Sequence, residues 1–108
     1  MNLQHLAENI GFELDEFLEL VDLFLETTDA DVKNLKAAIQ QQDAKSVAAS
    51  AHSIKGAAGN MGFQEIYDLA KNIEMDAREK QLGQALAHTD AIYGELKNLK
   101  QALEQSRG

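Results

Sequence analysis

Hydrophobic residues along the chain recur mostly every three or four positions, which is the spacing of one face of an α-helix. Such patterns cover residues 2–10, 13–42, 44–59, 63–80 and 84–105. No run alternates hydrophobic and polar residues over a useful length, so no β-strands are expected. The pattern therefore predicts an all-α protein.

The predicted helices are separated by short polar or glycine-containing breaks. Gly11 is placed to end the first helix, Asp43 to cap the start of the third, and Gly62 to break the chain before the fourth. Four amphipathic helices joined by short loops predict an antiparallel up-down four-helix bundle, with a short additional N-terminal helix. No linker-like stretch interrupts them, so residues 1–108 are expected to form a single domain.

Composition and charge exclude several classes of function. The chain has no cysteine, which excludes disulfides, thiolate metal sites and thiol catalysis. Its formal net charge is −8, and such a surface repels nucleic acid and anionic membranes. The first residues lack the features of a signal peptide, and no apolar stretch has the length of a bilayer span. A cytoplasmic monomer with neither nucleic-acid nor membrane partners is expected.

The segment SAHSIKGAAGNMG, residues 50–62, carries a histidine on the polar side of a predicted helix. On a helical wheel one side gathers hydrophobic residues that predict the core-facing stripe, namely Val47, Ile54, Ala58 and Met61. His52 lies nearly opposite and is expected to project from the bundle. The residues in line with it are Lys45, Ala48, Lys55, Gly56 and Gly59.

The residues around His52 favour phosphoryl transfer over other chemistry. A neutral imidazole is a nucleophile at neutral pH, and Lys55, one turn away, can neutralise an oxyanion held on that ring. Gly56 costs the helix about 1 kcal/mol relative to alanine, but it leaves bare backbone that a partner can approach closely. The alternative is an incidental surface histidine beside glycines that only end the helix. The spacing by itself leaves both interpretations open.

The stretch AHSIKGAAGNMGFQEIYDLAKNIE, residues 51–74, resembles the signature of histidine-containing phosphotransfer (HPt) domains of two-component phosphorelays. The family pattern places a lysine three residues after the histidine, and glycines four and ten residues after it. His52, Lys55, Gly56 and Gly62 match these positions. The predicted helices also fit the four-helix bundle of that family.

The resemblance implies a role for each residue of the signature. His52 would be the phosphoacceptor, Lys55 would steady the phosphoryl group, and Gly56 would leave room for a receiver domain. Glu74 and Arg78 occupy positions on the following helix that face the histidine. Some family members carry glutamine in place of Glu74, whose carboxylate would repel a phosphoryl group but can accept an imidazole N–H. Arg78 would supply a second cation.

The implied partners are a response-regulator receiver domain and a hybrid sensor histidine kinase. The protein itself would need no cofactor and would have neither kinase activity nor a nucleotide site, because no glycine-rich phosphate loop follows a strand. The divalent metal ion for transfer would belong to the partner receiver. An apolar patch for docking is expected near the histidine, and its candidates are Leu3, Leu6, Ile10 and Phe12. Alternatively, these four residues close the end of the bundle core.

Three other functions account for the sequence less well. A di-iron site within the bundle requires Glu-x-x-His pairs, and the sequence has none. A helical adapter that only binds partners remains compatible with the composition, but it gives no reason for His52, Lys55 and Gly56 to share one face. Phosphorylation of Ser53 is disfavoured, because this residue falls beside the exposed stripe and leaves the glycines unexplained.

Overall fold

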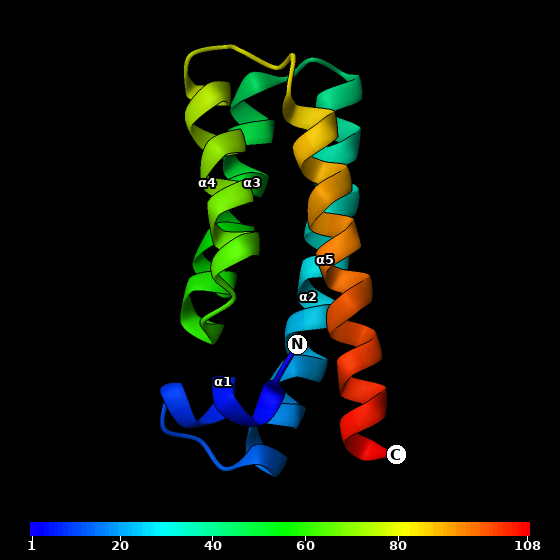
Figure 1. The fold of residues 1–108 in the computed structure, drawn as a ribbon. Helices are drawn as coiled ribbons and strands as arrows, with labels where there is room; N and C mark the ends of the chain where they lie inside the picture. Colours follow the sequence, from blue (N-terminus) through cyan, green and yellow to red (C-terminus); the bar gives the residue numbers. More distant parts are fainter.

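The computed structural model describes all 108 residues and contains five α-helices and no strands. The helices are α1 (Leu3–Asn9), α2 (Leu14–Gln40), α3 (Ala44–Met61), α4 (Gln64–Arg78) and α5 (Ala85–Arg107). Helices α2 to α5 run alternately up and down the bundle, and α1 lies across one end (Figure 1). The predicted fold class is therefore confirmed.

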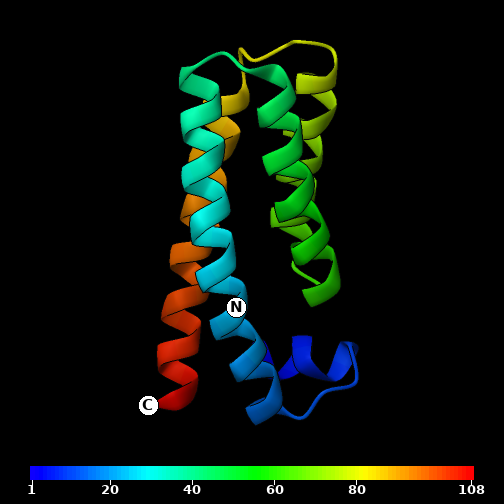
Figure 2. The same ribbon diagram turned by 180° about the vertical axis from the view of Figure 1, so that it is seen from behind.

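The four long helices form a closed ring in which each packs against two neighbours. Helix α3 contacts α2 and α4, and α5 contacts the same two helices from the other side. At about 1.5 Å per residue, α2 is about 40 Å long and α3 about 27 Å. The α3–α4 hairpin therefore ends before α2 and α5 do, and α1 lies beneath its end (Figure 2).

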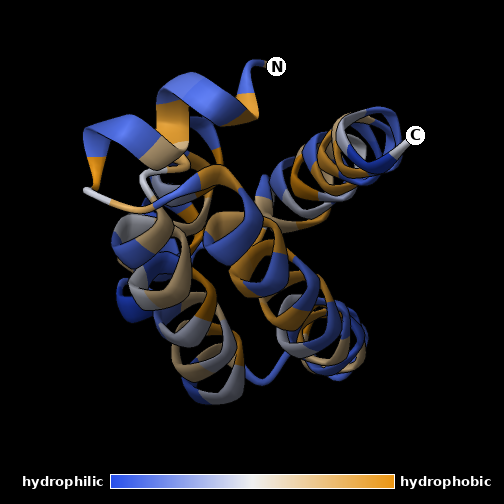
Figure 3. Cartoon of the chain, turned by 90° about the horizontal axis from the view of Figure 1, so that it is seen from below, coloured by the Kyte–Doolittle hydropathy of each residue, from blue (hydrophilic) through white to orange (hydrophobic).

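The core consists of buried hydrophobic side chains contributed by all five helices. Figure 3, a view along the bundle, shows hydrophobic and hydrophilic residues on different sides of the helices. Phe63, at the start of α4, packs against α2, since its ring meets Phe24 edge-on at a centroid distance of 4.9 Å and Phe17 at 6.2 Å. None of the five helices combines the length and the apolar character needed to span a bilayer. The core fixes how α3 and α4 lie side by side, which decides what surrounds His52.

The boundaries of α3 follow from residues at its two ends. The Asp43 side chain accepts a hydrogen bond from the backbone N–H of Ser46 at 3.2 Å, so the predicted N-cap is confirmed. The helix continues to Met61, two residues beyond its predicted end at Gly59. It ends there because Gly62 adopts the left-handed conformation with φ 77°, and this lets the Phe63 N–H bond to the Ala58 carbonyl.

Helix α1 mainly closes the end of the core. Leu3 is buried, and Leu6 and Ile10 are half-buried against the core cluster. Phe12, in the loop that leads to α2, remains exposed. The bundle-closing alternative thus holds for three of the four residues considered for an apolar patch, because Leu3 belongs to the core cluster and Leu6 and Ile10 pack against it.

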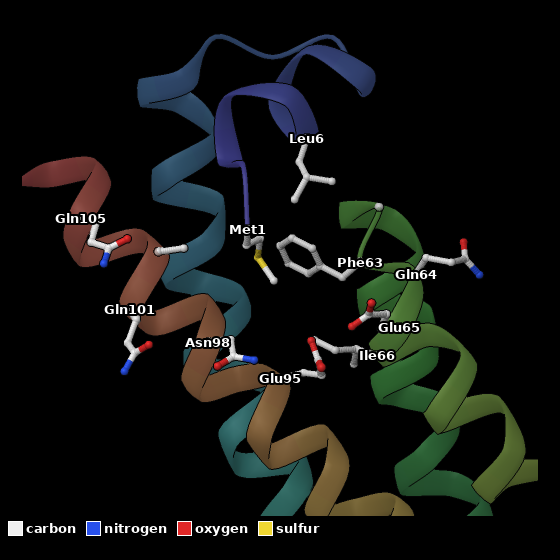
Figure 4. Close-up of a pocket in the computed structure, with 12 residues that line it drawn as sticks. Met1, Leu6, Phe63, Gln64, Glu65, Ile66, Glu95, Asn98, Gln101 and Gln105 are labelled. Atoms are coloured by element: carbon white, nitrogen blue, oxygen red, sulfur yellow. The ribbon is translucent and has the colours of Figure 1, made fainter.

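A groove of about 510 Å³ lies where α1, the start of α4 and α5 meet. In Figure 4 the carboxyl groups of Glu65 on α4 and Glu95 on α5 face each other across it. Partial burial and the neighbouring Glu65 raise the pKa of Glu95. Gly62 of the signature and Leu6 of the candidate docking patch line this groove, but neither His52 nor Lys55 does.

Candidate functional site

Helix α3 presents His52 on the side away from the core. Val47, Ile54 and Ala58 are completely buried and Met61 nearly so, which confirms the predicted core-facing stripe. The His52 side chain is 63% exposed. The predicted orientation of this helix is therefore correct.

The prediction that Ala48 shares the exposed face of His52 is wrong. Ala48 is only 8% exposed. Two helices, α2 and α4, pack against α3 from different directions, so the buried arc of α3 is wider than its stripe of large hydrophobic residues. A methyl side chain at the edge of that arc allows a neighbouring helix to cover it.

A buried carboxylate on α4 connects the polar residues of the site. Glu74 is 5% exposed, and its Oε2 lies 2.9 Å from Nδ1 of His52. Nζ of Lys55 lies 2.7 Å from Oε1 of Glu74, and Nη2 of Arg78 lies 2.6 Å from Oε2 of Glu74. The structure thus brings together four of the residues predicted for the site.

The surroundings of Glu74 keep its carboxyl group ionised. Burial raises its pKa, but hydrogen bonds from Lys55, Arg78 and His52 outweigh this effect and lower the pKa from 4.5 to about 2. An ionised carboxylate only accepts hydrogen bonds, so Nδ1 of His52 is the nitrogen that carries the proton. In the neutral ring, the free lone pair therefore lies on Nε2.

The three glycines near the end of α3 serve different purposes. A Cβ added at Gly56 would meet nothing within 4 Å, so packing inside the protein does not require a glycine there. At Gly59 a Cβ would lie 3.3 Å from Cδ2 of Tyr67, so this glycine allows α4 to pack closely. Gly62 supplies the left-handed helix end. Only Gly56 lacks a purpose within the fold.

The remaining candidates lie near the cluster but do not join it. Lys45 is exposed, seven residues or about 10 Å along the axis from His52. The Ser53 hydroxyl donates a hydrogen bond to Oδ2 of Asp31 at 2.9 Å, which places it toward α2 rather than beside His52. The exposed imidazole of His52 therefore stands on a surface that a macromolecule can reach.

Part of this arrangement lay beyond the sequence patterns. The pairing of Lys55 with Glu74 joins two helices and depends on how α3 and α4 are aligned. The pairing of Arg78 with Glu74 is signalled by their spacing of four residues on one helix. The contact between Tyr67 and Gly59 had no such signal.

Residues 19–107 match the Hpt domain family, and the chain belongs to that family. Hpt domains relay phosphate between sensor kinases and receiver domains in two-component phosphorelays. The fold is similar to that of histidine-containing phosphotransfer protein B (HptB) from Pseudomonas aeruginosa PAO1, with a TM-score of 0.85 and 29% identity over 99% of this chain and 93% of that one.

A second similar structure is the HPT domain of the Hpt sensor hybrid histidine kinase from Shewanella. It has a TM-score of 0.78 and 18% identity over 98% of this chain and 92% of that one, and it supports the fold alone. No protein of curated function matches the sequence. The family, together with the first of these structures, defines this chain as a phosphotransfer domain.

Proposed function

We propose that His52 is the phosphoacceptor of this Hpt domain. It takes a phosphoryl group from a receiver-domain aspartate, supplied by a hybrid sensor kinase, and passes it to the aspartate of a response-regulator receiver. The observation that carries this proposal is an imidazole 63% exposed to solvent whose Nδ1 is held by a buried carboxylate. Residues 1–108 act as one domain and as a monomer in this scheme.

The hydrogen bond to Glu74 selects the nitrogen that reacts. With the proton on Nδ1, the lone pair of Nε2 attacks the phosphorus of the aspartyl phosphate. The Nε2–P bond forms, the bond between phosphorus and the aspartate oxygen breaks, and the aspartate leaves as a carboxylate. The receiver brings the divalent ion that neutralises the phosphoryl oxygens, whereas this chain supplies the nucleophile.

Lys55 and Arg78 provide positive charge beside the ring. Lys55 uses one of its three N–H donors on Glu74, so the others are available to phosphoryl oxygens. Arg78 is 63% exposed and has further free N–H groups. Both cations are therefore placed to stabilise the phosphoryl group as it arrives on Nε2.

The docking face consists of the exposed side of α3 around His52, with Lys45, Gly56 and Gly59. Ala48 is too deeply buried to contribute much contact. Gly56 matters most, because its bare backbone serves no packing purpose within the chain. A phosphate-independent adapter is the alternative function, but it gives no reason to hold an exposed imidazole on a buried carboxylate.

Phosphotransfer from a receiver tests this assignment directly. A phosphorylated receiver from the same cell is mixed with the protein, and intact mass is followed for the gain of one phosphoryl group. The adduct should be labile in acid and stable in alkali, and His52→Gln should abolish it without changing the helical circular dichroism signal. His5→Gln is the matched control, since it removes an exposed histidine from α1. Unchanged transfer in His52→Gln would refute the assignment.

A further inference from the structure

The position of Glu74 raises a question that phosphate acceptance by itself does not answer. A carboxylate behind the phosphoacceptor repels the incoming phosphoryl group, because like charges repel strongly in a partly buried site. The resting cluster contains two cations, Lys55 and Arg78, and one anion. Its net charge of +1 would become +2 without Glu74 and would attract a phosphoryl group more strongly. A neutral acceptor could also select Nε2 for the acceptance step, so the negative charge of Glu74 points to a benefit in a later step.

We propose that Glu74 is a positioning residue for the onward transfer, which keeps Nδ1 of phosphorylated His52 protonated. The inference rests on the proposed role of His52 and assigns the purpose of its buried partner. Once Nε2 carries phosphate and Nδ1 keeps its proton, the ring is a cation. Oε2 of Glu74 lies 2.9 Å from that nitrogen and stabilises this cation directly.

The proton on Nδ1 decides how well the ring leaves phosphorus. When the receiver aspartate attacks, the Nε2–P bond breaks and its electron pair returns to Nε2. If Nδ1 holds its proton, the departing ring is neutral imidazole, and the proton stays where it was. If Nδ1 has lost its proton, the departing ring is an imidazolate anion, which is a far poorer leaving group. Protonation of Nδ1 therefore keeps the phosphoryl group transferable.

The cations near the ring only weakly oppose the stabilisation of protonated Nδ1 by Glu74. Lys55 on α3 and Arg78 on α4 disfavour a cationic ring, but both are bound to the Glu74 carboxylate. The phosphoryl group itself adds negative charge that attracts them away from the ring. On the α2 side, Asp31 accepts a hydrogen bond from the Ser53 hydroxyl. Glu74 is thus the anion in direct contact with Nδ1.

Titration of the phosphorylated protein tests the proposal without any receiver. The chain is labelled with ¹⁵N and phosphorylated with phosphoramidate, and the Nδ1 resonance of phospho-His52 is followed against pH in the wild type and in Glu74→Gln. Glutamine preserves the shape and an acceptor oxygen but removes the charge. The control is Glu79→Gln, which removes a charge from an exposed residue just beyond Arg78, where α4 has ended.

We expect Glu74→Gln to lose the Nδ1 proton at a pH about one unit lower or more, and Glu79→Gln to match the wild type. At a pH above both transitions, the phosphohistidine of Glu74→Gln should then lose phosphate to water about tenfold more slowly, because only the protonated ring is a good leaving group. Glu74→Asp keeps the negative charge but shortens the side chain, so the charge lies farther from Nδ1. Its Nδ1 transition should fall at a pH between those of the wild type and Glu74→Gln, and this variant remains informative if the glutamine variant folds poorly.

Two results would overturn the proposal. One is an Nδ1 transition at the same pH in the wild type and in Glu74→Gln, and the other is failure of phosphoramidate to load His52 while other histidines are loaded. The relay can fail separately: a protein that loads with phosphoramidate and shows the expected shift, yet exchanges phosphate with no receiver, would refute the proposed function but leave the role of Glu74 intact.

Discussion

Replacing Gly56 by alanine separates two reasons for a glycine within a helix. If the position matters only for folding, the added methyl group should destabilise the protein. The structure predicts the opposite, because a Cβ at Gly56 meets no atom within 4 Å. The helix should gain about 1 kcal/mol from replacing glycine by alanine. For a domain of this size that gain corresponds to a melting temperature about 4–6 °C higher.

Phosphoryl transfer from a receiver should become slower as the side chain at position 56 becomes larger. A partner that packs against bare backbone at Gly56 cannot accommodate a leucine without a shift that costs about 1–3 kcal/mol. Gly56→Leu should therefore weaken receiver binding, or slow transfer below saturation, by about tenfold or more. Thermal unfolding by circular dichroism and transfer followed by intact mass are measured on the same samples.

Gly94→Ala is the matched control for this experiment. Gly94 lies within α5, and an added Cβ there also meets nothing within 4 Å. It should stabilise the protein to the same extent and leave transfer unchanged. Gly59→Ala should gain less, since its Cβ would lie 3.3 Å from the ring of Tyr67. Loss of stability in Gly56→Ala, or wild-type transfer in Gly56→Leu, would refute the argument that this glycine serves a partner.

Three further predictions concern charge and burial. Lys55→Ala should lower the free energy of unfolding by about 1–2 kcal/mol at pH 7, because the buried Glu74 carboxylate loses a hydrogen-bonded cation. The same variant should slow transfer or shorten the lifetime of the phosphohistidine. A variant with an unchanged melting temperature and unchanged transfer would contradict this prediction. The raised pKa of Glu95 means that protonation favours the folded state, so its contribution is present below pH about 4.5 and is lost as pH rises through the raised value. Glu95→Gln should therefore raise the melting temperature at pH 7 and have little effect on it at pH 4. Equal shifts of the melting temperature at both pH values would exclude repulsion from Glu65. Thr28→Val should stabilise the protein by about 1 kcal/mol, since the buried Thr28 hydroxyl has no hydrogen-bond partner, and a lower melting temperature would indicate a hidden partner.

The periodicity of the chain by itself determined the helices and the direction in which His52 points. Residues of one helix keep a fixed angular relation whatever they pack against. The opposition of His52 to Ile54 and Ala58 could therefore be derived before any tertiary contact was known. Asp43 and Gly62 acted through their own backbone geometry in the same way. The resemblance to the family depended on the spacings of His52, Lys55, Gly56 and Gly62, which are also local along the chain.

Only the tertiary structure decided which atoms of different helices meet. The position of Glu74 within hydrogen-bond distance of both His52 and Lys55 requires a particular alignment of α3 and α4, which the packing of the whole core sets. The burial of Ala48 and the contact between Gly59 and Tyr67 have the same origin. A helical wheel gives directions around one axis, whereas burial depends on how many neighbours cover that direction and how closely they approach.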